Sequence, residues 1–207
     1  MTFRGALVLA LALSTSPARA APVTKVPEIP FEKYALDNGL EVILHRDPAL
    51  PLVAVNLWYH VGPVNEPPKR SGFAHLFEHL MFTGSKHVGT GFDKLLESAG
   101  ATNVNGTTSW DRTNYFETVP REQLELCLWI ESDRMGFFLD TLSAGALEVQ
   151  RGVVKNERRQ SYEDAPYGKS SLELLDTLFP QGHPYHGAVI GSMSDLDAAR
   201  LSDAEAF

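Results

Sequence analysis

The sequence predicts an α+β fold in which a mixed, mainly antiparallel sheet packs against several helices. Strand patterns fill the first half of the chain, whereas helical patterns dominate the second half. The strands do not alternate one by one with helices, so a doubly wound parallel sheet is not expected. At 207 residues, the chain has room for one domain and a tail.

The N-terminus has the three parts of a secretory signal peptide. Arg4 precedes a short apolar run over residues 5–13, and Ala-Arg-Ala at 18–20 is typical of a cleavage site. The apolar run is about half of the roughly 20 residues that a membrane span needs. We therefore expect residues 1–20 to be removed and the protein to be exported, as a periplasmic or secreted protein without a transmembrane segment. An uncleaved anchor is the alternative.

An extended lead-in and a strand pair are expected next. Residues 21–33 are rich in proline and predict an extended segment. Asp-Asn-Gly at 37–39 is a turn sequence between short apolar segments at 34–36 and 40–44, which predicts a hairpin. Residues 52–61 are rich in Val, Leu, Trp and Tyr and predict a further strand.

The first helix is predicted over residues 71–82. The segment before it, 62–71, contains three prolines and is not expected to be regular. Ser71 offers an N-cap oxygen, and Gly84 marks the end of the helix. A short helix is expected over 92–98.

Two polar strands and three helices complete the predicted order. The strands are expected over 102–109 and 112–119, the helices over 121–138, 144–164 and 168–179, and a loop over 180–187.

Composition excludes several classes of protein. The chain is 43% apolar and 21% charged, as in folded soluble proteins. Its single cysteine, Cys127, excludes an intrachain disulfide framework and a multi-cysteine zinc site, and we expect it to be a buried, inert thiol. The formal net charge of −8 argues against a nucleic-acid partner, because phosphates are bound by Lys and Arg.

The strongest chemical signal is the segment His75-Leu-Phe-Glu78-His79. Helical residues four apart share a face, so both imidazoles can bind one cation. Glu78 is close enough to accept a proton from water at that cation. The apolar positions around these three residues predict a buried helix, in which a carboxylate needs a compensating partner such as a metal. Two core histidines with a structural glutamate are the alternative.

A catalytic zinc site usually has a third protein ligand on another element. Glu157 is the best candidate, because Val154 places it on the apolar face of the helix predicted over 144–164. Glu148 falls on a different face. The alternative for Glu157 is an internal ion pair with Arg112, Arg158 or Arg159.

The segment Gly72-Phe-Ala-His-Leu-Phe-Glu-His-Leu-Met-Phe-Thr-Gly84 resembles the inverted zinc motif, His-x-x-Glu-His, of the pitrilysin/insulinase family of zinc peptidases. That family includes the mitochondrial processing peptidases. Residues 36–44 resemble its opening strand, and Asn-Gly-Thr-Thr at 105–108 resembles its Asn-Ala-x-Thr edge strand. Residues 151–157 resemble the helical segment that carries the third ligand. The resemblance covers roughly residues 34–207.

The resemblance implies a zinc metalloendopeptidase that hydrolyses peptides or small unfolded polypeptides with zinc-activated water. One Zn²⁺ would be bound by His75, His79 and Glu157, and Glu78 would be the catalytic base. The edge strand would bind the extended substrate. The substrate-binding residues would be Asn105, Gly106 and Thr108.

Two features depart from the family pattern. Active members carry a supporting glutamate seven residues before the ligand glutamate, where this chain has Gln150, which can form hydrogen bonds but carries no charge. Family members also continue into a second, similar domain or act beside a partner subunit. We therefore expect residues 34–207 to be a zinc-binding N-terminal peptidase domain that is truncated at its C-terminal end. A non-catalytic partner subunit or binding module of the same family is the alternative.

Overall fold

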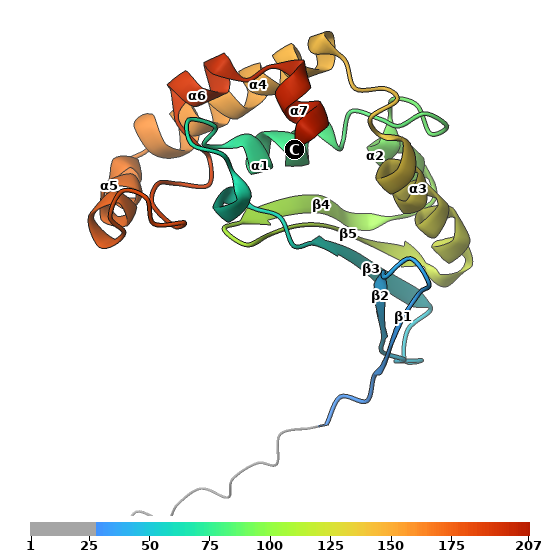
Figure 1. Cartoon of the computed structure of the whole chain (residues 1–207). Coiled ribbons are helices and arrows are strands. Elements are labelled where there is room, and N and C mark those ends of the chain that lie inside the picture. Colours follow the sequence, from blue (N-terminus) through green and yellow to red (C-terminus); the bar gives the residue numbers. More distant parts are fainter. Residues whose placement is uncertain (1–27) are drawn as a thin grey trace, which may run out of the picture. The chain divides into compact units, whose positions relative to one another are not determined.

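The computed structural model describes residues 28–207 (Figure 1). The expected signal peptide and most of the expected lead-in therefore lie outside the described residues. The chain divides into two units, one ending at Pro48 and one running from Ala49 to Phe207.

The first unit contains the predicted hairpin. Strand β1 (Glu32–Ala35) pairs antiparallel with β2 (Glu41–Leu44). Gly39 lies in the turn with a φ of 88°, a conformation that glycine adopts readily. The side chain of Asn38 accepts a hydrogen bond of 3.1 Å from the backbone N–H of Leu40, which closes the turn.

The second unit is built on a three-stranded antiparallel sheet. Its strands are β3 (Leu52–Tyr59), β4 (Thr102–Ser109) and β5 (Arg112–Pro120), and their order is β3-β5-β4. A bulge between Thr102 and Asn105 shifts the register of β4, and Asn103 has a φ of 55° there. Within this sheet β4 is therefore an edge strand, as expected for the segment at 105–108.

Helices cover one face of the sheet (Figure 1). Helix α1 packs against β4 and β5, and α4 packs on α1, so α1 lies between the sheet and α4. The helices are α1 (Phe73–Leu80), α2 (Phe92–Ser98), α3 (Leu124–Phe137), α4 (Ala144–Arg158), α5 (Gly168–Leu178), α6 (Met193–Ala198) and α7 (Leu201–Ala206). The predicted α+β class, with an antiparallel sheet and several helices, is confirmed.

Some predicted boundaries were wrong. The helix predicted from residue 121 begins as a 3-10 turn at Arg121–Gln123, and another 3-10 turn, Pro63–Asn65, lies in the proline-rich segment. The helix predicted over 144–164 is α-helical only as far as Arg158 and continues as a π-helical turn over Arg159–Glu163.

The start of α1 also differs from the prediction. Its N-cap residue is Gly72, not Ser71, because the Ser71 hydroxyl donates a 2.6 Å hydrogen bond to Asp195 instead. The carboxylate of Glu66 accepts hydrogen bonds from the backbone N–H groups of Gly72 and Ala74, at 3.1 and 2.8 Å. A carboxylate from the preceding loop thus replaces the expected serine cap.

Two apolar clusters form the core between sheet and helices. The larger joins α1 to α4, α6 and α7, and includes Leu76, Leu80, Val154 and Leu196. The smaller joins α2 and α3 to the sheet and includes Val119. Across residues 28–207, no helix combines the length and hydropathy that a membrane crossing requires.

A buried polar cluster lies beside the smaller apolar cluster. Arg134 forms an ion pair with Glu131, and both side chains are about 2% exposed. The guanidinium also lies over the rings of Phe92 and Tyr115, at 4.0 and 4.3 Å from their centroids. Cys127 is fully buried, as expected, and its thiol donates a hydrogen bond of 2.7 Å to buried Glu117. We call these four residues, Glu117, Cys127, Glu131 and Arg134, the arginine cluster.

Candidate metal centre

Helix α1 presents His75 and His79 on the side that faces Glu157 of α4. The Nε2 atom of His75 lies 3.6 Å from Oε2 of Glu157, and that of His79 lies 3.4 Å from the same oxygen. The three side chains offer ligand atoms that all lie within 4.8 Å of one another. Among residues 28–207, this is the one group of three or more His, Cys, Asp or Glu side chains with spacing suited to a metal ion.

The packing of α4 explains the position of Glu157. Leu147 and Val154 are buried against the core, and Glu157 follows Val154 by three residues on the same side of the helix. The structure does not support the alternative of an ion pair with arginine. Arg158 pairs with Glu163 at 3.3 Å, and Arg159 donates a hydrogen bond to Asn156.

The protonation states of this group suit a metal ion. Burial lowers the pKa of His75 to about 4, although the negative charge of Glu157 opposes this effect, so the imidazole is neutral at pH 7. The hydrogen bond from His79 lowers the pKa of Glu157, which keeps its carboxyl group ionised. Neutral imidazole and ionised carboxylate are the forms that bind zinc.

The spacing of the three side chains fits zinc as well. Ligand atoms about 2.0–2.1 Å from a tetrahedral zinc lie roughly 3.3–3.4 Å from one another. The two histidine-to-glutamate distances, 3.4 and 3.6 Å, are close to that value. The residues present therefore fit a zinc ion in type and in these two distances.

Glu78 lies in the same cleft but is not part of the group of three. Its side chain is buried, and it accepts a hydrogen bond at Oε2 from the hydroxyl of Thr108 on β4. Burial raises the pKa of Glu78, and the hydrogen bond from Thr108 opposes part of that rise. The carboxyl group is thus held between α1 and the edge strand.

The cleft has a volume of about 510 Å³. It brings together all the predicted metal, base and substrate residues, whereas Gln150, predicted as a supporting residue, does not line it. Its lining residues are His75, Glu78, His79, Asn105, Gly106, Thr107, Thr108, Glu157, Tyr162, Val189 and Ile190.

Four of the lining residues were not predicted as site residues by the sequence analysis: Thr107, Tyr162, Val189 and Ile190. Tyr162 follows Glu157 by five residues on the π-helical turn, where helical periodicity no longer indicates which side a residue faces. Val189 and Ile190 come from the loop before α6, and their apolar character gives no signal for a site.

Gln150 lies two turns before Glu157 on α4 and is half-buried. Within the described part of the chain, its side chain forms no hydrogen bond. The supporting role that the resemblance implies for this position is therefore not visible in the geometry.

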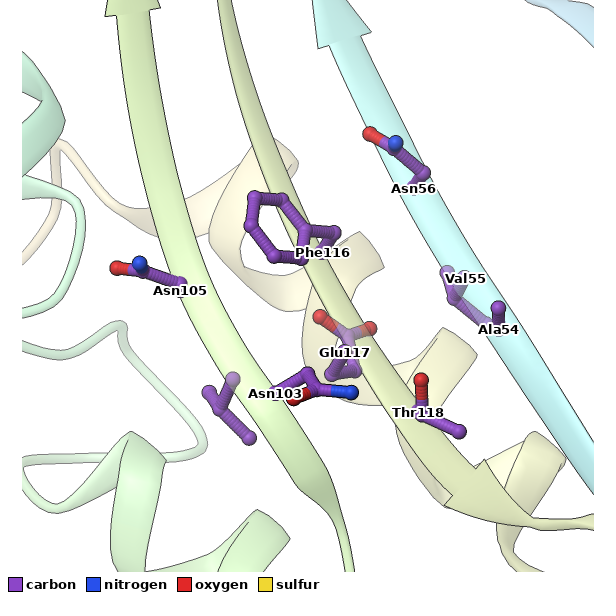
Figure 2. A pocket seen from close by; sticks show the side chains of 9 residues that line it. Ala54, Val55, Asn56, Asn103, Asn105, Phe116, Glu117 and Thr118 are labelled. Atoms are coloured by element: carbon purple, nitrogen blue, oxygen red, sulfur yellow. The ribbon is translucent and has the colours of Figure 1, made fainter.

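A second cavity, of about 390 Å³, lies on the sheet (Figure 2). It is lined by Ala54, Val55, Asn56, Asn103, Val104, Asn105, Phe116, Glu117 and Thr118. Figure 2 shows amide side chains of β3 and β4 around the ring of Phe116. This cavity has one carboxylate and no histidine or cysteine, so it offers no comparable set of metal ligands.

Comparisons with known proteins match this chain to a family of peptidases. The Insulinase family (Peptidase family M16) matches this chain over residues 41–191. The zinc protease PqqE of Helicobacter pylori is 33% identical over 178 residues, which are 85% of this chain and 39% of that protein.

Solved structures show the same fold. The crystal structure of a protease from Helicobacter pylori matches with a TM-score of 0.81 and 32% identity, over 86% of this chain and 42% of that one. The periplasmic protease PqqL from Escherichia coli matches with a TM-score of 0.74 and 26% identity, over 86% of this chain and 20% of that one.

This chain thus spans about two fifths or less of the length of these relatives. The family match, in contrast, covers well over half of the chain itself and includes the whole candidate metal centre. The chain belongs to the Insulinase family, Peptidase family M16.

Proposed function

We propose that this chain is the metal-binding part of a zinc-dependent endopeptidase that hydrolyses peptides or small unfolded polypeptides. The observation that carries this proposal is the position of Glu78. Its buried carboxyl group lies in one cleft with His75, His79 and Glu157, and that cleft borders an edge strand. The family is one of peptidases, and a relative is named a zinc protease.

Each residue of the cleft has a role in this proposal. His75, His79 and Glu157 hold one zinc ion, which supplies a Lewis acid for the scissile carbonyl and makes water more acidic. Glu78 accepts the proton that the attacking water loses and delivers it to the amide nitrogen as the peptide bond breaks. The burial of Glu78 raises its pKa and so makes it a better proton acceptor than an exposed glutamate.

The edge strand β4 is the proposed substrate-binding element. An extended peptide can add to it as a further strand, so that backbone hydrogen bonds give affinity for many sequences. Asn105 is exposed on this strand, and both Asn105 and Gly106 line the cleft. This mode of binding suits unfolded chains better than folded proteins.

We further propose that the protein is exported and works with a second homologous domain or a partner subunit. The signal-peptide pattern supports export, and the related PqqL is described as periplasmic. The length of the relatives supports a further domain, which would enclose the peptide and exclude water.

A non-catalytic subunit of the same family is the second candidate. It is favoured by one observation, the neutral Gln150 at the position where the resemblance implies a supporting glutamate.

The test compares Glu78→Gln and Glu148→Gln in the protein that carries this chain. The exported form, which should begin at Ala21, is checked by mass spectrometry. Cleavage of a quenched fluorescent peptide is then measured together with zinc content. Glu78→Gln should retain zinc but lose turnover by 10³-fold or more, because the base is gone. Glu148 is exposed and lies on the other side of α4, so its variant should behave as wild type.

Zinc-bound wild-type protein that cleaves no peptide would favour the non-catalytic subunit. An undiminished rate in Glu78→Gln would show that Glu78 is not the base.

A further inference from the structure

The edge strand β4 has two faces with different surroundings. Asn105 and Thr107 pair with Phe116 and Asn114 of β5, and Asn105 and Phe116 also line the second cavity. Successive residues of a strand point to opposite faces. Gly106 and Thr108 therefore face α1, and the hydroxyl of Thr108 donates to Oε2 of Glu78.

The hydrogen bonds of the neighbouring Thr113 indicate that the Thr108 hydroxyl is the donor in its contact with Glu78. A threonine hydroxyl has one proton. Thr113 gives its proton to the backbone carbonyl of Val61, at 3.0 Å. Its oxygen lies 3.5 Å from that of Thr108. Thr108 is thus left to donate its single proton to Glu78, and no proton remains on this hydroxyl for a substrate carbonyl.

Gly106 completes the contact between β4 and Glu78. A Cβ atom on Gly106 would lie 3.1 Å from both Cγ and Oε1 of Glu78 and 3.0 Å from a ring carbon of Phe82. The backbone of β4 therefore approaches the stem and the second oxygen of the carboxylate closely. Two residues of one strand, both on the face toward α1, restrict the rotation of the Glu78 side chain.

We infer that Thr108 is a positioning residue for Glu78, and not the substrate-binding residue that the sequence resemblance implied. This inference rests on the proposed function in one respect, namely that Glu78 is the catalytic base. The hydroxyl holds Oε2, so that Oε1 is the oxygen left to accept a proton. The strand that binds the substrate backbone along its edge thereby also sets the position of the base.

The expected consequence is a loss of rate without a loss of binding. A misplacement of about 1 Å can cost roughly 100-fold in rate. We expect Thr108→Val, which keeps the shape but removes the hydroxyl, to lower kcat about 10- to 100-fold and to change KM less than threefold. Thr108→Ser should restore most of the rate because it restores the donor.

The experiment uses the protein that carries this chain, with four variants: Thr108→Val, Thr108→Ala, Thr108→Ser and Thr102→Val. Thr102 is exposed on the same strand and makes a matched control. Zinc content and thermal unfolding show whether each variant is folded and loaded, and Thr108→Ala substitutes for Thr108→Val if the latter does not fold.

A second measurement does not depend on turnover. In the Glu78→Gln background, the affinity for the uncleaved peptide is measured by fluorescence anisotropy with and without Thr108→Val. A positioning role predicts the same affinity in both proteins. It also predicts that Thr108→Val adds no further loss to the residual rate, because the two residues act through one hydrogen bond.

Several outcomes would overturn the inference. These are a peptide affinity that falls with Thr108→Val, a raised KM with unchanged kcat, or a Thr108→Ser variant as slow as Thr108→Val. These outcomes differ from the one that would contradict the proposed function, in which Glu78→Gln turns over peptide at the wild-type rate.

Discussion

The metal centre and the arginine cluster are both groups of ionisable side chains, but the first lines a cleft and is partly exposed, whereas the second is almost fully buried, and they balance their charge in different ways. In the arginine cluster, the cation belongs to the chain, since Arg134 pairs with Glu131 and is almost fully buried. In the metal centre, two carboxyl groups, Glu78 and Glu157, lie near two imidazoles. Burial lowers the pKa of His75 to about 4, so this imidazole supplies no charge at pH 7.

This difference in charge balance indicates which of the two groups is suited to bind a metal cation. Uncompensated charge is costly inside a protein, and it persists only where a partner is supplied. In the arginine cluster, the chain itself supplies the counter-ion of Glu131, which is Arg134. The metal centre has ligand atoms with a spacing suited to a metal ion and lines a cleft, so a cation bound from solution would complete its charge balance.

The largest effect should come from breaking the arginine cluster. Arg134→Met should lower the free energy of unfolding by about 3–5 kcal/mol, because Glu131 is left buried without a counter-ion. Denaturation by urea measures this change. Arg121→Met, at an exposed position, should change the stability by less than about 0.5 kcal/mol.

Adding Glu131→Gln to Arg134→Met should recover part of the loss, because the unpaired charge is then removed. No recovery in the double variant would mean that packing of the arginine over the rings of Phe92 and Tyr115 matters more than its charge.

The two clusters also differ in how far the sequence predicts them. Helical spacing is enough to place His75 and His79 on one face, and the apolar face of α4 is enough to favour Glu157. Glu131 and Arg134, three residues apart on α3, look like an ordinary solvated ion pair. Their burial depends on the rings of Phe92 and Tyr115, which come from distant parts of the chain.

Contacts with distant parts of the chain also explain why the sequence did not predict the cap of α1 or the contact of Thr108 with Glu78. Ser71 has the right residue type for a cap, but Glu66 reaches the first backbone N–H groups of α1 across a loop whose path the sequence does not indicate. Strand alternation gives the face of Thr108, but only the packing of α1 on β4 shows that Glu78 lies opposite its hydroxyl. The local sequence pattern thus predicts which residues share a face of a helix or strand, whereas tertiary packing determines which residues that face contacts.

The second expected effect is the stabilisation of the metal centre by zinc. Zinc at 100 times its dissociation constant should raise the free energy of unfolding by about 2.7 kcal/mol, since it binds the folded chain. Thermal unfolding with zinc and with a chelator measures this shift. Glu157→Gln should bind zinc at least tenfold more weakly and show a smaller shift at the same zinc concentration.

Glu148→Gln on the same helix should keep the full stabilisation by zinc, because its side chain points away from the cleft and pairs with Arg151. Equal stabilisation of wild type and Glu157→Gln would contradict the proposed ligand set.

The smallest effect concerns the second carboxyl group of the arginine cluster. Arg134 pairs with Glu131, so Glu117 has no cation of its own, and burial together with the charge of Glu131 raises the pKa of Glu117 to about 7. The hydrogen bond from Cys127 opposes this rise only in part.

The raised pKa makes stability depend on pH with a definite sign. In the unfolded chain a glutamate loses its proton near pH 4.3. Between that value and about pH 7 the unfolded state is ionised while folded Glu117 keeps its proton, so the unfolded state binds fewer protons. The contribution of Glu117 to stability is therefore complete below about pH 4 and is lost as the pH rises to about 7.

Glu117→Gln should remove this dependence. Glutamine stays neutral and can still accept the hydrogen bond from the Cys127 thiol. A shift of one pKa unit corresponds to 1.36 kcal/mol. The free energy of unfolding of the variant, relative to that of wild type, should therefore rise by about 1–3 kcal/mol from pH 5 to pH 8. Urea denaturation at the two pH values measures the difference, with Glu125→Gln, exposed on α3, as the control. If the difference between wild type and Glu117→Gln were the same at both pH values, Glu117 would be ionised throughout, and Arg134 would then compensate two carboxylates instead of one.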